Sequence, residues 1–262
     1  MTQREKAARF RALHEGEPFV IPNPWDAGSA RMLATLGFQA LATTSSGFAF
    51  TLGTLDGEVT LDEIVEHTAA IDAAADLPVS VDLENGYGAA PEDAARAIAS
   101  AAAAGAVGGS IEDWDRGGRI YEHQHAVERV VAAVEAARAL DFPFTLTARA
   151  EGLLHGDTDV GDVLERLQAF DAAGADVLYA PGLATVEQID EVCSAVSKPV
   201  NVLARPTLSL DEIVGAGAQR VSVGGALTWA AVGAFVEAAG AIADRGDFSQ
   251  LGSGSVLDAW RF

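Results

Sequence analysis

The sequence predicts a single (β/α)8 barrel, in which eight parallel strands alternate with helices. Eight short apolar runs rich in β-branched residues recur at fairly even spacing, with Ala-rich helical stretches between them. Several helical stretches end in Gly and enter the next strand at once, as at Leu36-Gly37-Phe38 and Ala104-Gly105-Ala106. Glycine readily adopts the left-handed conformation that ends a helix. The runs are apolar on both faces, which is typical of parallel strands covered by helices.

In chain order, the expected strands are residues 19–22, 39–43, 78–83, 106–111, 144–149, 175–180, 199–203 and 219–224. A doubly wound sheet is the competing fold, but no glycine-rich fingerprint follows the first strand, and Gly86-Tyr87-Gly88 after the third strand lacks the third glycine. The length of 262 residues suits one barrel domain over 1–262. Residues 226–262 are expected to form a C-terminal helix and a docking tail, the tail being 255–262.

The composition excludes several classes of partner. The chain has 17 Lys+Arg against 38 Asp+Glu and a net charge of −21, so nucleic acid and anionic membranes are not expected to bind. The charged N-terminus lacks the apolar stretch of a secretory signal, and we expect a soluble, cytoplasmic protein. The apolar stretch 226–243 is interrupted by Glu237, which suits a buried or interface helix better than a membrane span.

Other reactive residue types give weaker predictions. Cys193 is the single cysteine, so no internal disulfide or thiolate metal cluster is expected, and we interpret it as a packing thiol. His14 and His67 are expected on the surfaces of helices. The sequence contains no Gly-x-Ser-x-Gly elbow and no P-loop, so serine hydrolase and nucleotide kinase activities have no support.

Acidic side chains gather at the carboxyl ends of the expected strands, where barrels of this kind build their active sites. Asp82 and Glu84 end the third strand, Glu112 follows the fourth, and Asp56 lies in the loop region after the second. Like charges in one small volume are costly unless a cation neutralises them. Oxygen ligands predict a hard divalent cation, Mg²⁺ with several waters, with Mn²⁺ as an alternative.

A cationic and a hydroxyl-rich segment complete the predicted site. Arg149 ends the fifth strand, and a guanidinium facing a divalent cation suits a small dianionic acid. Ser45-Ser46-Gly47 would supply an oxyanion pocket, and Asn201 on the seventh strand is a further candidate for substrate binding. This combination suits a pyruvate-like enolate. The competing interpretation is that the acids only cap helices and that Arg149 only pairs with Glu151.

Four motifs together resemble the isocitrate lyase and phosphoenolpyruvate mutase superfamily. They are Thr44-Ser45-Ser46-Gly47, Asp82-x-Glu84-x-Gly86-Tyr87-Gly88, Ile111-Glu112-Asp113 and Ala148-Arg149-Ala150-Glu151. The resemblance covers nearly the whole chain and implies a (β/α)8 barrel whose last helix is exchanged between partners, usually in a homotetramer built as a dimer of dimers.

The same resemblance implies roles for individual residues. It implies Mg²⁺ bound directly by Asp82, with Asp56, Glu84 and Glu112 acting largely through water. It implies a small carboxylic acid substrate, an α-keto or α-hydroxy acid, whose carboxylate or enolate oxygens are held by Arg149 and by the segment Ser45, Ser46 and Gly47.

The loop over residues 112–123 departs from the superfamily pattern. The carbon–carbon lyases carry a cysteine proton donor there, in a Lys-Lys/Arg-Cys-Gly-His motif, and this chain has none. We therefore do not expect a true isocitrate or methylisocitrate lyase. The lysine and asparagine of the mutase branch are also absent, and Arg116 and Arg119 are cations of different shape. The segment 179–182, Tyr-Ala-Pro-Gly, predicts a less polar substrate pocket.

Our first hypothesis is a Mg²⁺-dependent carbon–carbon lyase acting on a small 2-oxo- or 2-hydroxy-dicarboxylic acid, with decarboxylation of an oxaloacetate-like acid favoured. Because CO₂ leaves without a proton, bond cleavage does not need the missing cysteine. Water, Tyr87 or His123 would then protonate the enolate. The alternatives are a mutase or hydrolase of phosphonopyruvate-like acids, in which Arg116 or Arg119 meets the phosphoryl group, and a barrel that binds a keto acid without turnover.

Overall fold

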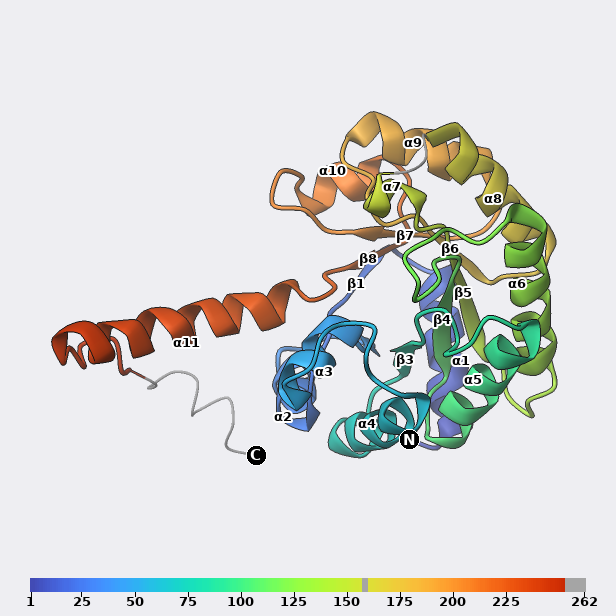
Figure 1. The fold of residues 1–262 in the computed structure, drawn as a ribbon. Coiled ribbons are helices and arrows are strands. Elements are labelled where there is room, and N and C mark those ends of the chain that lie inside the picture. Colours follow the sequence, from blue (N-terminus) through green and yellow to red (C-terminus); the bar gives the residue numbers. More distant parts are fainter. Residues whose placement is uncertain (157–159, 253–262) are drawn as a thin grey trace.

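The computed structural model describes residues 1–156 and 160–252, and in that part of the chain a parallel sheet curls into a nearly closed barrel surrounded by helices (Figure 1). The strands pair in the order β1-β8-β7-β6-β5-β4-β3-β2. They are β1 Phe19–Ile21, β2 Leu41–Ala42, β3 Val79–Asp82, β4 Gly108–Glu112, β5 Thr145–Arg149, β6 Val177–Tyr179, β7 Val200–Leu203 and β8 Arg220–Ser222. The amide of Ala42 donates to the carbonyl of Pro22 at 3.1 Å, which joins the remaining edge.

All eight expected strands are confirmed, and each is shorter than expected. One helix, α1 Gln3–Glu15, precedes the first strand. Helices follow every strand: α2 Ala27–Thr35, α3 Ser45–Leu52, α4 Leu61–Ala74, α5 Pro91–Ala103, α6 His123–Arg138, α7 Gly152–His155, α8 Val160–Ala172, α9 Val186–Ala195, α10 Leu210–Gly215 and α11 Ala226–Arg245. The predicted helix-to-strand glycines adopt left-handed backbone, with φ of 107° at Gly105 and 99° at Gly174.

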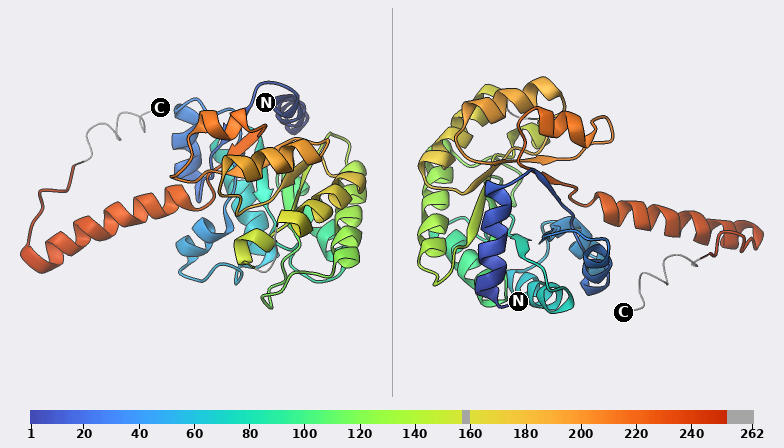
Figure 2. Two further views of the ribbon diagram at one scale, coloured as in Figure 1. Left: turned by 90° about the horizontal axis from the view of Figure 1, so that it is seen from above. Right: turned by 180° about the vertical axis from the view of Figure 1, so that it is seen from behind.

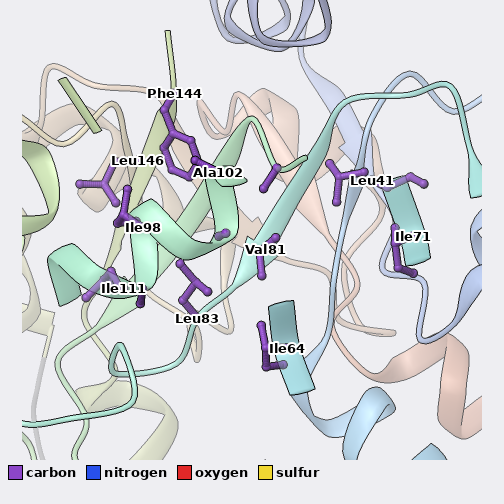
Figure 3. Close-up of a cluster of buried hydrophobic side chains, with 14 of the residues drawn as sticks. Leu41, Ile64, Ile71, Val81, Leu83, Ile98, Ala102, Ile111, Phe144 and Leu146 are labelled. Atoms are coloured by element: carbon purple, nitrogen blue, oxygen red, sulfur yellow. The ribbon is translucent and has the colours of Figure 1, made fainter. Parts of the chain in front are cut away.

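The apolar core lies between the barrel and its helices. Figure 3 shows one part of it, where Val81 and Leu83 of the β3 region meet Ile98 of α5 and Ile111 of β4. These side chains are almost completely removed from water. Small alanines on α5 let it lie close to the sheet, so the amphipathic pattern of this helix becomes a tightly packed layer.

Two histidines are buried, contrary to the expectation from the sequence. His14 of α1 faces the bottom of the barrel, where its Nδ1 donates to the carbonyl of Phe10 at 2.8 Å. His67 of α4 stacks on Phe48 with 3.8 Å between ring centroids. The surface prediction was wrong because both histidines lie on the face of an amphipathic helix that packs inward. Cys193 lies half-buried on α9, where burial raises its thiol pKa to about 11, in agreement with a packing role.

The last described helix, α11, is the one element that leaves the barrel. It projects outward in all three views (Figure 1, Figure 2). Trp229, Phe235 and Val236 expose half or more of their surface on it. By length and composition α11 is apolar enough to cross a membrane, with 11% of its most apolar window buried, but one such helix is weak support for a span. The predicted docking tail, 255–262, lies outside the described residues.

Candidate active site

Two adjoining hollows open at the carboxyl ends of the strands. The first, of about 200 Å³, lies in the barrel mouth and is lined by Ser46, Asp82 and Asn201 among others. The second, of about 400 Å³, lies under the loop after β4 and is lined by Glu84 and Glu112 among others. Ser45, Asp56 and Arg149 line both hollows. A larger hollow of about 530 Å³ lies at the opposite end of the barrel, away from the strand ends where this fold places its chemistry.

Asp82 is the most connected carboxylate at the barrel mouth. It ends β3, and its Oδ1 accepts from Arg149 at 2.8 Å and from the Ser110 hydroxyl at 3.4 Å. Its Oδ2 accepts from the amide of Ser45 at 3.3 Å. The backbone amide of Asp82 donates to the hydroxyl of Thr43 at 2.9 Å, so the strand end itself is fixed. Through these hydrogen bonds Asp82 connects the end of β3 with the carboxyl-terminal parts of β2, β4 and β5.

Arg149 is surrounded by three carboxylates. Its nitrogens lie 2.8 Å from Asp82, 3.1 Å from Glu112 and 2.8 Å from Glu151. Burial alone would lower the pKa of Arg149, but the three carboxylates outweigh it and raise that pKa. The predicted pairing with Glu151 is present, but as one of three. A guanidinium has five N–H groups, so three bonds leave donors free for a ligand.

Burial also changes the acidity of the carboxyl groups. It raises the pKa of Asp56, with the Ser45 hydroxyl opposing the change, and it raises the pKa of Glu112 well above the usual range. Burial raises the pKa of Glu84 to about 7, against the lowering effect of the Arg116 guanidinium. Closely spaced acids in a partly dry site favour a bound cation, because a cation stabilises their charged forms.

The Ser45-Ser46-Gly47 segment is the first turn of α3. Thr44 is the N-cap, and its hydroxyl accepts from the amide of Gly47 at 3.4 Å. Ser45 and Ser46 line the barrel mouth, where the positive end of the helix favours anionic oxygens. Gly47 is placed differently: a Cβ there would come within 2.5 Å of the Thr228 hydroxyl, so its function is close packing rather than lining the hollow.

The loop after β4 is anchored on both sides. Trp114 stacks on His155 of α7, with ring centroids 3.4 Å apart. Arg116 donates to the carbonyl of Val59 at 2.7 Å and to Glu84 at 3.2 Å. Asp115 bonds Arg119, whose side chain is 82% exposed, at the tip of the loop. Of the two arginines that the sequence singled out, only Arg116 lines the second hollow.

Tyr87 and His123 lie outside both hollows. Tyr87 has a left-handed backbone (φ 63°), its hydroxyl donates to Glu84 at 3.3 Å, and the Arg116 guanidinium lies 4.6 Å from its ring centroid. Burial raises its pKa. His123 is half-buried at the start of α6. The structure therefore places Tyr87 beside Glu84, and it brings neither Tyr87 nor His123 to the lining of the two hollows.

Asn201 lies where the sequence placed it, and two other residues that line the same hollow, Arg220 and Asn23, were missed. Its amide donates to the Ser222 hydroxyl at 3.0 Å, and its Oδ1 accepts from Arg220 at 2.8 Å. Arg220 could have been noticed as a lone cation inside an apolar strand. Asn23 lines the same hollow and accepts from the amides of Val223 and Gly224, both at 2.9 Å. Its position between two prolines just after β1 was the available indication.

The donor set fits a hydrated hard cation. The four predicted metal residues, Asp56, Asp82, Glu84 and Glu112, all offer carboxylate oxygens to the adjoining hollows. Among residues 1–156 and 160–252, no three acidic, histidine or cysteine side chains form a preformed metal cage. This arrangement is compatible with Mg²⁺, which keeps several waters and needs only one or two direct carboxylates, more than with a cation that needs a complete protein cage.

Comparison with known proteins agrees with this geometry. The family model for phosphoenolpyruvate phosphomutase matches residues 10–243. The chain belongs to this family. It is 31% identical over 233 residues to an oxaloacetate decarboxylase of Rhodopseudomonas palustris (strain BisB5), covering 85% of this chain and 78% of the relative. It is 30% identical over 229 residues to the 2-methylisocitrate lyase of Escherichia coli (strain K12), covering 81% and 76%.

A solved structure extends the likeness to the whole fold. The family member from Burkholderia cenocepacia J2315, described as a candidate lyase or mutase, superposes with a TM-score of 0.94 at 50% identity, over 99% of this chain and 97% of that chain. The relatives of this family member are lyases and mutases of the isocitrate lyase and phosphoenolpyruvate mutase superfamily, as the sequence motifs predicted. These comparisons are consistent with an enzyme of the carbon–carbon lyase class.

Proposed function

We propose that this family member is a Mg²⁺-dependent lyase that decarboxylates a small oxaloacetate-like 2-oxo-dicarboxylic acid through a pyruvate-like enolate. The observation that carries the proposal is the convergence of Asp82, Glu112 and Arg149 at the barrel mouth. The oxaloacetate decarboxylase relative supports this substrate class. Mn²⁺ is an alternative metal with similar oxygen ligands.

Asp82 would hold the metal directly, and Asp56, Glu84 and Glu112 would hold it through water. When bound, the divalent ion would stabilise negative charge on the substrate's keto oxygen. The free N–H groups of Arg149 would orient a substrate carboxylate. The hydroxyl of Ser46 and the positive end of α3, where Ser45 also lies, would meet its oxygens.

Decarboxylation breaks the bond between C3 and the departing carboxylate, and the electron pair remains as the enolate while CO₂ leaves. One proton then adds at C3 and gives the 2-oxo acid product. We propose that water in the hollow supplies this proton, because Tyr87 and His123 do not line it. The proposal therefore needs no substitute for the cysteine of the related lyases.

The test is the conversion of oxaloacetate to pyruvate with Mg²⁺ and with excess chelator, after subtraction of the metal-catalysed background. We expect Asp82→Asn to lower the metal-dependent rate by at least about a hundredfold, because it removes charge while preserving shape. Glu92→Gln, which neutralises an exposed acid on α5, is the control and should leave the rate unchanged. Full activity of Asp82→Asn would contradict the proposed site.

A second candidate is phosphonopyruvate chemistry, favoured by Arg116, whose guanidinium lines the same hollow as Arg149. It predicts turnover of phosphonopyruvate rather than oxaloacetate. Binding of Mg²⁺ and oxalate with turnover of neither acid would favour the third possibility, a barrel that binds keto acids without converting them.

We also propose that α11 packs against a second copy of the chain, within a dimer of dimers. Its exposed apolar side chains favour such a partner. The charge of −21 argues against nucleic acid and anionic membrane partners, and we propose a cytoplasmic location.

A further inference from the structure

Arg220 is a buried cation with only neutral partners. It begins β8, and its side chain points into the barrel interior, where 5% of the residue is exposed. Its nitrogens donate to Asn201 Oδ1 at 2.8 Å and Thr147 Oγ1 at 3.0 Å, and lie 3.2 Å from His14 Nε2. Among the described residues, no carboxylate is paired with it.

The third partner is neutral as well. Burial lowers the pKa of His14 to about 3, so its imidazole is uncharged at neutral pH. Its Nδ1–H is used on the carbonyl of Phe10, which leaves the lone pair of Nε2 to accept from Arg220. Burial lowers the pKa of Arg220 to about 10, which still leaves the guanidinium charged at neutral pH.

A buried charge without a counter-charge is costly, and proteins usually pair it. Two other largely buried arginines follow that rule: Arg149 contacts three carboxylates, and Arg166 contacts Asp113 and Asp162. Arg129 is bonded to backbone carbonyls of the loop after β3 and has the structural function of holding that loop. Among these four arginines, Arg220 alone combines a place in the lining of the barrel-mouth hollow with a charge that no carboxylate compensates.

The two guanidinium groups of the hollow therefore contribute differently to its potential. Arg149 is outweighed by Asp82, Glu112 and Glu151, so the group that would touch a substrate carboxylate does not make its surroundings positive. Arg220 adds a full positive charge from beneath, in an interior where charges act over longer distances than in water.

We propose that Arg220 sets the charge preference of the barrel-mouth hollow, favouring small dianionic acids over singly charged ones while remaining out of contact with the reacting atoms. This inference rests on the proposed function, because it explains how a site rich in carboxylates accepts an oxaloacetate-like dianion. Arg220 is thus a specificity-determining residue that acts in two ways. Its charge raises the electrostatic potential in the hollow, and its hydrogen bond holds Asn201 in place.

The alternative is that Arg220 only anchors α1 through His14. The two possibilities predict opposite changes in the affinity for a cation when Arg220 is replaced. Loss of a positive charge from the field weakens an anion but strengthens a cation bound at the same site, whereas loss of a structural anchor weakens both. Binding of Mg²⁺ alone and of oxalate therefore separates them without any measurement of activity.

The experiment compares wild type, Arg220→Met and Arg220→Lys by titration calorimetry at fixed ionic strength. The ligands are Mg²⁺ alone and, at saturating Mg²⁺, oxalate or oxamate, in which a neutral amide replaces one carboxylate. For Arg220→Met we expect the Kd of oxalate to rise on the order of tenfold, that of oxamate to rise less, and that of Mg²⁺ alone to fall. Arg220→Lys, which keeps the charge, should restore the wild-type preference for oxalate over oxamate.

Equal weakening of Mg²⁺, oxalate and oxamate, or no change, would overturn the assignment of Arg220 and leave the proposed function standing. Failure of the wild type to bind either Mg²⁺ or oxalate would overturn the proposed function, and the inference with it. If Arg220→Met does not fold, His14→Leu/Arg220→Met replaces the buried pair with apolar side chains, and the same expectations apply to it.

Discussion

At the residue scale, His14 shows how a single buried imidazole couples stability to pH. Its pKa falls from 6.5 to about 3 because burial disfavours the charged form and Arg220 repels it. Between those values the unfolded chain binds a proton that the folded protein does not, so stability is lost as the pH falls below 6.5. Each pKa unit of difference between the folded and unfolded states is worth about 1.4 kcal/mol. At pH 5 we therefore expect protonation of His14 in the unfolded chain to lower the free energy of unfolding by about 2 kcal/mol.

The measurement is urea unfolding at pH 7.5 and pH 5.0. His14→Gln keeps an amide oxygen for Arg220 but does not titrate, so its stability should fall less between the two pH values than that of the wild type. His123→Gln removes an imidazole from the half-buried start of α6 and is the matched control, expected to follow the wild type. If His14→Gln is as sensitive to acid as the wild type, His14 is not the group responsible.

At the element scale, the loop after β4 is held by Arg116, and the neighbouring Arg119 offers a matched comparison. Arg116 lowers the pKa of Glu84, whereas Arg119 is bonded to Asp115 at the exposed tip. Removing Arg116 should raise the pKa of Glu84 further above 7, so Mg²⁺ binding should require a higher pH. We expect Arg116→Ala to shift the pH dependence of Mg²⁺ affinity toward higher pH, because Glu84 holds its proton longer, and Arg119→Ala to leave that pH dependence unchanged, as measured by calorimetry between pH 6 and pH 8. Equal effects of the two substitutions would contradict this account.

The same two variants separate carbon–carbon from carbon–phosphorus chemistry. In the proposed decarboxylase, Arg116→Ala retains oxaloacetate turnover once Mg²⁺ is saturating, because the arginine acts through Glu84. A phosphonopyruvate enzyme would lose its activity at every Mg²⁺ concentration, because the guanidinium would meet the phosphoryl group. Pyruvate formation from each acid, measured against Mg²⁺ concentration, distinguishes the two.

The sequence predicts features of this region that depend on local patterns, and it does not predict contacts between residues that lie far apart in the chain. The alternation of apolar runs with Gly-terminated helices predicted every strand, and therefore brought Asp82, Glu112 and Arg149 to one end of the barrel. The absence of a gate-loop cysteine was also plain from the sequence. The Trp114–His155 stack was not, because nothing local marks a contact made only after the barrel closes. Likewise, the neutral surroundings of Arg220 depend on three other elements.

At the scale of the whole molecule, the barrel is complete without α11, which shares few contacts with it. Trp229 meets Phe50 of α3 at 5.7 Å between ring centroids, but Phe235 and Val236, further along the helix, are 69% and 60% exposed. An apolar helix with these exposures is stabilised by covering it, and a second copy of the chain offers an equivalent helix and barrel face. A lipid bilayer is the competing partner by composition alone.

Light scattering on the purified protein decides between these partners. We expect the wild type to have about four times the 27.0 kDa mass of the chain, without binding to phospholipid vesicles. Phe235→Asp should shift the mass toward smaller species, because it places a charge in the covered face, while circular dichroism shows the barrel still folded. Glu237→Gln lies two residues further on, about 200° around the helix, and should leave the mass unchanged. A monomeric wild type that sediments with vesicles would show that α11 meets lipid instead of a second copy.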